Sequence, residues 1–276
     1  MCLIAWSWQP AAQCPLLLAA NRDEWLRRPT QAMHWWPGDD PAEPLLAGRD
    51  LEGGGTWLGI SRDGRLAALT NVREPSDAQP ARPSRGQLVA RFLQRRHPLH
   101  EGQRWRHDGV ALWAAELQRG MQRYAGFNLL LADLRRREML WVSNRAGATT
   151  VAAGVHGLSN AALDTPWPKV LKLRRGLAGC AGDAGDSPAR GDFAALLDHL
   201  SDPTPASDAE IAAQAESLPL SPSWRRGLSA AFIRLPDYGT RCSTLVRASA
   251  DGRMQVLEVQ HQPAAGRRQF HWNWRE

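Results

Sequence analysis

The chain opens with MCLIAWSW, residues 1–8, in which a cysteine directly follows the initiator methionine. Met1 is normally removed when a residue as small as cysteine follows, and Cys2 would then carry a free α-amine beside its thiol. A thiol titrates at about 8.5 and an α-amine at about 7.7–8.0. One residue could therefore supply both a nucleophile and the base that activates it. The same apolar stretch also fits the first strand of an ordinary core.

The segments that follow predict hairpins. Residues 16–20 are continuously apolar, and the turn-forming residues 9–15 separate them from residues 3–8, which predicts two paired strands buried on both faces. Asp63-Gly64 lies between two strand-like runs and predicts a second hairpin, because a tight turn of this kind needs positive φ. Residues 28–50 contain four prolines and predict a long irregular loop that covers other elements.

Helices and strands are expected in separate blocks. Ser84 to Gln87 has capping-box spacing ahead of a helical pattern, and a second helix is expected from Asp108. Further helices are expected at 168–177, 192–200 and 208–217, and further strands at 126–132, 138–143, 149–158, 242–248, 254–260 and 269–274. This order lacks regular β-α-β alternation. We expect an α+β fold of two antiparallel sheets with helices outside them, in a single domain spanning residues 1–276.

Composition excludes several classes of function. The chain is 43% hydrophobic and 22% charged, as in a soluble globular protein. The net charge of +6 comes from scattered arginines, and no dense basic tract indicates nucleic-acid binding. The four cysteines form no CxxC pair, and no secretory signal or run of about 20 apolar residues is present. We expect a reduced, cytoplasmic protein without a membrane span, a cofactor or a metal, and the sequence leaves its oligomeric state open.

Short motifs spread along the chain carry a family resemblance. Asn21-Arg22-Asp23-Glu24 follows the second expected strand, and GGTWLG follows at residues 54–59. Further motifs are Thr70-Asn71-Val72-Arg73, Gly157-Leu158-Ser159-Asn160 and Thr240-Arg241-Cys242-Ser243-Thr244. Together with Met1-Cys2 they resemble the NRDE family, the transport-and-Golgi-organisation protein 2 group, over essentially the whole chain. That family is in turn similar to N-terminal-nucleophile hydrolases of the penicillin V acylase and bile-salt hydrolase type, which implies a four-layer αββα fold.

The resemblance implies a catalytic role for several of these residues. Cys2 would attack an amide carbonyl while its α-amine receives the thiol proton. Asp23 would hold the resulting ammonium, and Arg22 would favour the thiolate. Asn71 and Asn160 would donate hydrogen bonds toward the oxyanion and the α-amine. Taken alone, however, both asparagines follow strand-like runs, where asparagine is an ordinary turn residue.

Two further residues near the C-terminal motif have open interpretations. The resemblance makes Arg241 an additional positive charge at the site, although by itself it could lie on the surface. Cys242 is expected to be a buried, inert thiol. Adjacent strand residues point to opposite faces, so Arg22 and Asp23 could both face Cys2 only if the strand turned there. The acylases also separate these two residues, which makes Asp23 the stronger candidate.

Two functions from different classes are therefore open. The first is a hydrolase that cleaves the C–N amide bond of a small N-acyl substrate with an apolar part. The second is a non-catalytic carrier with the same fold, whose ligand is haem or an acyl lipid, because eukaryotic relatives in the family are linked to haem mobilisation and lipid homeostasis. The expected pocket residues are Trp25, Trp35, Trp36 and Trp57.

Overall fold

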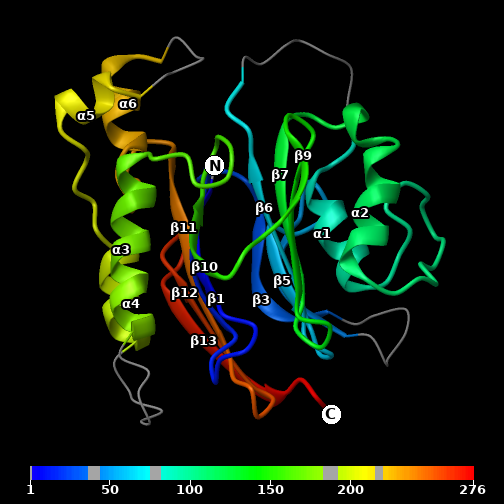
Figure 1. The fold of residues 1–276 in the computed structure, drawn as a ribbon. Coiled ribbons are helices and arrows are strands. Elements are labelled where there is room, and N and C mark those ends of the chain that lie inside the picture. Colours follow the sequence, from blue (N-terminus) through cyan, green and yellow to red (C-terminus); the bar gives the residue numbers. More distant parts are fainter. Residues whose placement is uncertain (1, 37–43, 75–81, 183–191, 215–219) are drawn as a thin grey trace. The chain divides into compact units, whose positions relative to one another are not determined.

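The chain folds into two compact units. The computed structural model describes residues 2–36, 44–74, 82–182, 192–214 and 220–276. The first unit consists of Met1–Arg27, Arg73–Pro75 and Ala153–His271, and the second of Arg28–Val72, Ser76–Ala152 and Trp272–Glu276. Each unit contains one sheet and its own helices (Figure 1).

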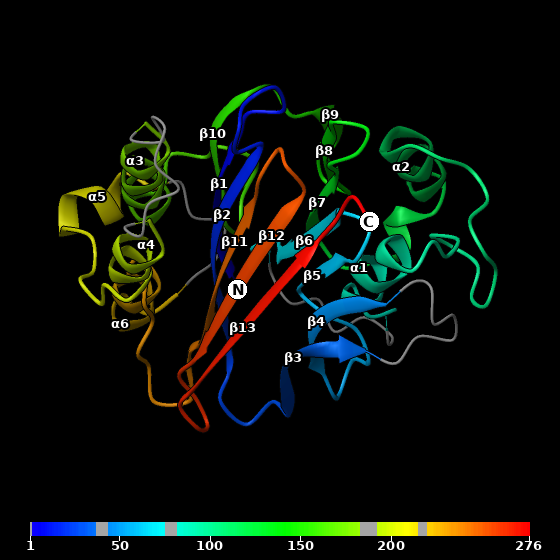
Figure 2. The same ribbon diagram turned by 90° about the horizontal axis from the view of Figure 1, so that it is seen from below.

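The first unit is built on a six-stranded sheet with the order β10-β1-β2-β11-β12-β13 (Figure 2). Helices α3 and α4 pack against β1, β2, β10 and β11. The interface between helices and sheet is apolar, with Leu3, Leu17 and Leu245 beside Leu173 and Leu196. The strands are β1 (Cys2–Trp8), β2 (Leu16–Trp25), β10 (Gly154–Leu158), β11 (Tyr238–Ala248), β12 (Arg253–Gln260) and β13 (Gly266–Asn273). The helices are α3 (Pro168–Gly182), α4 (Asp192–Leu200), α5 (Asp208–Ala212) and α6 (Pro222–Leu228).

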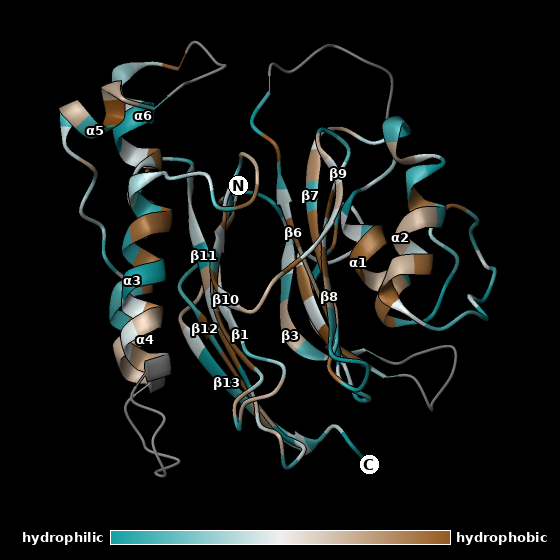
Figure 3. Ribbon diagram, in the orientation of Figure 1, coloured by the Kyte–Doolittle hydropathy of each residue, from teal (hydrophilic) through white to brown (hydrophobic). Residues whose placement is uncertain are grey.

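The second unit is built on a seven-stranded sheet in sequential order, β3 to β9. Helices α1 and α2 pack on this sheet, and α1 is largely brown in Figure 3, the colour of hydrophobic residues. Leu88 and Trp113 of these helices share one core with Leu129 and Val142 of the strands. The strands are β3 (Thr30–Trp36), β4 (Leu45–Asp50), β5 (Leu58–Ser61), β6 (Arg65–Asn71), β7 (Phe127–Asp133), β8 (Glu138–Ser143) and β9 (Gly147–Thr150). The helices are α1 (Gly86–Leu93), α2 (Val110–Gln118) and a 3-10 turn at Met121–Arg123.

The predicted fold class, two antiparallel sheets with helices, is confirmed. So are both N-terminal hairpins: β1 pairs with β2, and β5 with β6, where Gly64 has the expected positive φ of 89°. The long loop predicted at 28–50 is wrong, because β3 and β4 pair there. Pro29 and Pro44 stand just before these strands, where the missing N–H group breaks no ladder hydrogen bond.

Three local predictions also change. Ser84 forms no capping box, because the N-cap of α1 is Arg85 and makes no side-chain cap. The strand predicted at 149–158 is divided between β9 in the second unit and β10 in the first. Helix α6 was not predicted from the sequence. The helix predicted at 208–217 is shorter, because α5 ends at Ala212. Within the described ranges, no helix is long and apolar enough to cross a membrane.

Candidate active site

Cys2 lies at the start of β1 and shares a row with residues of the two neighbouring strands. It pairs with Arg22 of β2, and Arg22 pairs with Cys242 of β11. Directly opposed residues of antiparallel strands project from the same face, so the two thiols flank the Arg22 guanidinium group. Cys2 is 9% exposed and Cys242 is buried, as expected for the latter.

The environment of Cys2 keeps its thiol protonated. Burial raises the pKa of the Cys2 thiol, and this outweighs the opposing effects of the N-terminal charge, of the Arg22 charge and of the Asp23 backbone N–H, which donates to the sulfur. The thiolate that Arg22 was expected to favour is therefore not the resting state at neutral pH. A nucleophilic Cys2 needs a base that removes its proton during the attack.

Asp23 is buried and held by two side chains of β11. The Thr240 hydroxyl donates to Asp23 Oδ1 at 2.7 Å, and the Tyr238 hydroxyl donates to the Asp23 backbone carbonyl at 2.8 Å. Thr240 Oγ1 also accepts the N–H of Ile233 at 2.9 Å. Burial raises the pKa of the Asp23 carboxyl, and Lys169 is the strongest opposing influence. The carboxylate is thus held by Thr240, which the register of β11 places directly opposite Asp23.

The strand does not turn at Arg22 and Asp23, because β2 continues to Trp25. The two side chains therefore project from opposite faces of the sheet. Arg22 shares the face of Cys2, while Asp23 contacts the Cys2 sulfur through its backbone N–H. The irregularity lies instead in β11, where the register shifts between Thr240 and Cys242 and leaves Arg241 as a bulge. A bulge re-aims the side chain that it carries.

The bulged Arg241 is buried and close to Arg22. Its guanidinium group donates to the backbone carbonyls of Trp25 at 2.8 Å and Gln262 at 3.3 Å. Burial, followed by the neighbouring Arg22 charge, lowers the pKa of Arg241. Arg241 is therefore a fixed internal cation and not the surface residue that its sequence context also allowed.

Asn160 follows β10 and is adjacent to Ser159, whose hydroxyl contacts the backbone of Cys2. Ser159 Oγ donates to the Cys2 carbonyl at 2.9 Å and is 3.1 Å from Asn160 Oδ1. The Arg73 backbone N–H donates to the Asn160 carbonyl at 2.7 Å. Asn71 ends β6 opposite Phe127 in the second unit, and its role in the site stays a prediction.

Sequence reasoning missed Lys169, the second residue of α3. Its side chain is 3% exposed, and Nζ has no hydrogen-bond partner among the described residues. Burial lowers the pKa of Lys169 to about 8, opposed chiefly by the attraction of Asp23. One signal was visible in the sequence: Lys169 is one of only two lysines among 34 basic residues.

Asn21, the first residue of the N-R-D-E motif, is structural. Its side-chain amide donates to the carbonyls of Leu200 and Ala231, both at 2.8 Å, and Oδ1 accepts the Ser243 hydroxyl at 2.6 Å. Leu200 ends α4, so Asn21 attaches this helix and the segment before β11 to the centre of the sheet. The motif therefore combines an anchor with two residues that adjoin Cys2.

Trp25 is the one predicted pocket tryptophan in the unit that contains Cys2. It is 41% exposed, and its ring lies 5.7 Å from Trp224 of α6 and 5.4 Å from Tyr238, measured between ring centroids. Because Tyr238 also contacts Asp23, this aromatic group begins immediately next to the site.

The other three tryptophans belong to the second unit. Trp36 is buried in its core, Trp35 contacts Trp272, and Trp57 packs over Gly48. A common pocket for these rings and Trp25 stays a prediction.

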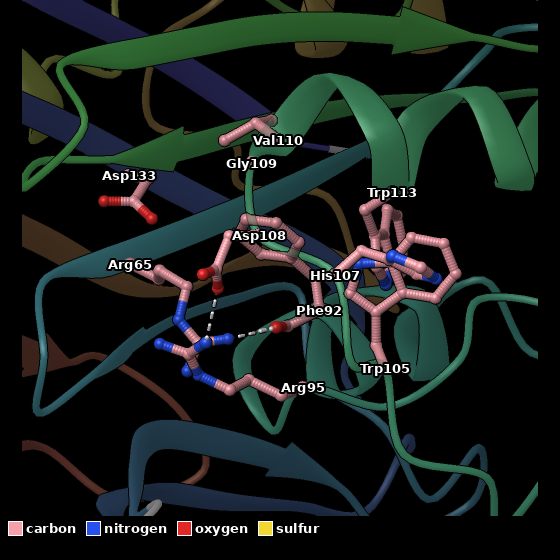
Figure 4. Close-up of a pocket in the computed structure, with 10 residues that line it drawn as sticks. All are labelled: Arg65, Phe92, Arg95, Trp105, His107, Asp108, Gly109, Val110, Trp113 and Asp133. Carbon is pink, nitrogen blue, oxygen red and sulfur yellow. Dashed lines mark hydrogen bonds and ion pairs between the residues drawn. The ribbon is translucent and has the colours of Figure 1, made fainter.

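A small pocket occurs within the second unit, between α1, α2 and the adjoining strands (Figure 4). Arg65 donates to the Phe92 carbonyl at 3.0 Å, and Arg95 bridges Asp63 and Asp108 at 3.0 and 3.1 Å. These contacts form a structural ion-pair cluster. No group of three or more His, Cys, Asp or Glu side chains arranged to hold a metal occurs in the part of the chain that the structure describes.

Known proteins match the chain along nearly all of its length. A family model described as "Transport and Golgi organisation 2" matches residues 1–263. The transport and Golgi organization protein 2 homolog of Bos taurus is 35% identical over 274 residues, covering 94% of this chain and 92% of that protein. The Homo sapiens homolog is 32% identical over 275 residues, with the same shares covered. Among solved structures, the Caenorhabditis elegans N-acylethanolamine-hydrolyzing acid amidase ortholog has a TM-score of 0.48 at 9% identity, covering 88% of this chain and 91% of that one.

Proposed function

The chain belongs to the Transport and Golgi organisation 2 family, and we propose that it is an N-terminal-nucleophile hydrolase that cleaves the C–N amide bond of a small N-acyl substrate. The observation that carries the proposal is the pairing of a protonated, buried Cys2 thiol with a buried carboxylate, Asp23, that Thr240 fixes in place. Such a carboxylate has an evident purpose once Met1 is removed, because it then faces the new α-amine of Cys2.

The reaction would proceed in two balanced halves. The α-amine takes the thiol proton as sulfur bonds to the carbonyl carbon and the carbonyl π electrons move to oxygen. The ammonium then gives its proton to the leaving nitrogen as the C–N bond breaks, which leaves a thioester on Cys2 and releases the amine. In the second half, water adds to the thioester while the α-amine accepts its proton. The C–S bond then breaks, the acid leaves and the thiol is restored.

The oxyanion of both halves needs fixed positive groups. Arg22 shares the face of Cys2, and Arg241 is the next cation along that side. Asn160 follows the serine that binds the Cys2 carbonyl. Together with Asn71 these residues are the proposed source of charge and N–H donors, and removing one donor of this kind typically costs about 10²–10³ in kcat.

The test combines intact mass with a thiol-directed acylating probe. Cys2→Ala is the main variant, since alanine also permits removal of Met1. Cys14→Ala is the matched control, because Cys14 is partly exposed and reports indiscriminate labelling. We expect a protein without Met1 whose labelling is lost only in Cys2→Ala. Full retention of Met1, or equal labelling of all three proteins, would exclude the mechanism.

A second candidate, a carrier for an acyl lipid or haem, is favoured by one feature. Trp25 exposes a large apolar surface beside Trp224 and Tyr238, next to the site. Titration of the wild type and Trp25→Ala with a fatty acid, followed by tryptophan fluorescence, and with haem, followed by the Soret band, tests it. Saturable binding that weakens in Trp25→Ala supports a carrier, and the absence of saturation with both ligands excludes it.

A further inference from the structure

Lys169 occupies a position that is unfavourable for a lysine. It lies in the first turn of α3, where the helix dipole presents positive charge. Its ammonium group is buried without a hydrogen-bond partner among the residues described, and an unpartnered buried charge is costly. An apolar residue at this helix position would avoid both penalties.

The charged surroundings of Lys169 come from several separate segments. Its strongest attraction is to Asp23 of β2, its strongest repulsion is from Arg73, and it also attracts a thiolate at Cys2. Arg73 stacks over Trp167, 4.6 Å from the ring centroid, just before α3. The other titratable or charged groups that act on Cys2 and Asp23 are the N-terminal ammonium group, Arg22, Tyr238 and Cys242. Asp23 is thus the nearby negative group available to balance Lys169.

Removal of Met1 would add a second amine to the same carboxylate. The pKa of Lys169 is about 8 in the fold, so its ammonium group is retained at neutral pH. A free α-amine titrates at about 7.7–8.0, and a second ammonium group beside the same carboxylate lowers that pKa further. At neutral pH the α-amine is then the group that gives up its proton, while Lys169 keeps its own.

We propose that Lys169 is a positioning residue for proton transfer: its ammonium group neutralises Asp23, so that the α-amine of processed Cys2 stays unprotonated and can accept the thiol proton. The inference rests on the proposed function. The Lys169 proton itself does not move during the reaction. Without Lys169, Asp23 holds the α-amine as an ammonium ion, which cannot act as a base.

The test measures the α-amine directly. Cys2→Ala protein, with removal of Met1 verified by intact mass, is prepared with ¹³C-labelled alanine methyl groups, and the Ala signal at position 2 is followed by NMR as pH changes. It is assigned by its absence from Cys2→Ser. Lys169→Met removes the charge and Lys169→Arg keeps it, while Lys169→Gln is a second neutral variant that serves if the methionine variant does not fold.

We expect the titration midpoint of the α-amine to rise by about one pH unit or more in the neutral variants and to stay in place in Lys169→Arg. An unchanged midpoint in the neutral variants overturns the inference. So does an equal rise in Lys169→Arg, because the role would then depend on shape and not on charge. Turnover of amide substrates by the Cys2 protein is measured separately, so absent turnover with a shifted midpoint would reject the proposed function alone.

Discussion

Thr240 connects the sheet to the candidate carboxylate, and its replacement by valine has a calculable cost. Valine keeps the shape of threonine but loses the hydroxyl that donates to Asp23 Oδ1 and accepts the N–H of Ile233. A hydrogen bond to a charged group contributes about 1.5–3 kcal/mol and a neutral one about 0.5–1.5 kcal/mol. We therefore expect Thr240→Val to lower the free energy of unfolding by about 2–4 kcal/mol and to raise the pKa of Asp23 further.

Urea denaturation at pH 7 measures this loss. Thr244→Val is the matched control, because Thr244 is buried on the same strand but pairs with Ala20 and Glu258. The loss in Thr240→Val should exceed that in the control and should shrink when Asp23 is already replaced by asparagine, because that exchange removes the charge. Equal losses in Thr240→Val and Thr244→Val would refute the account of how Asp23 is held.

Four further predictions concern stability. Asn21→Leu removes three buried hydrogen bonds and should cost about 3–5 kcal/mol in urea denaturation; a loss below about 1 kcal/mol would contradict its role as an anchor. Tyr238→Phe loses one hydroxyl contact and should cost only about 1 kcal/mol. Gly55→Ala places a Cβ 2.2 Å from a backbone carbon and should sharply lower the thermal midpoint, whereas Gly179→Ala in α3 meets nothing within 4 Å and should gain up to about 1 kcal/mol. Burial holds the pKa of Lys169 at about 8, so the folded state binds fewer protons than the unfolded state above that pH. Stability relative to Lys169→Met should therefore rise between about pH 8 and 10.5, by up to about 3 kcal/mol, and a fall in that range would be the contrary result.

The strands and hairpins could largely be predicted because their signals are local. Residues 16–20 form a continuous apolar run, and Asp63-Gly64 specifies its turn by chemistry at a single position. The strands at 28–50 could not be predicted in this way. Their prolines stand at strand starts or outside the described residues, and what makes Leu45–Asp50 a strand is its pairing with both β3 and β5.

The candidate site was only partly predictable for a related reason. Cys2 and Asp23 were visible as residue types within motifs. The role of Thr240 depends on a register shift in β11, which no local pattern encodes. Lys169 was missed because lysine in a helix is ordinarily solvated, and only tertiary packing shows that this one is buried beside a carboxylate.

The position of β11 in the chain has a consequence for the timing of N-terminal processing. The row of residues that contains Cys2 and Arg22 is complete only when β11 pairs with β2, and β11 begins at Tyr238. At synthesis rates of about 5–20 residues per second, Tyr238 follows Cys2 from the ribosome by roughly 10–50 s. Under the proposed function, an aminopeptidase would have this interval in which to remove Met1 before β11 pairs with β2. Slower translation of the last quarter of the message would then lengthen the interval and favour the processed form.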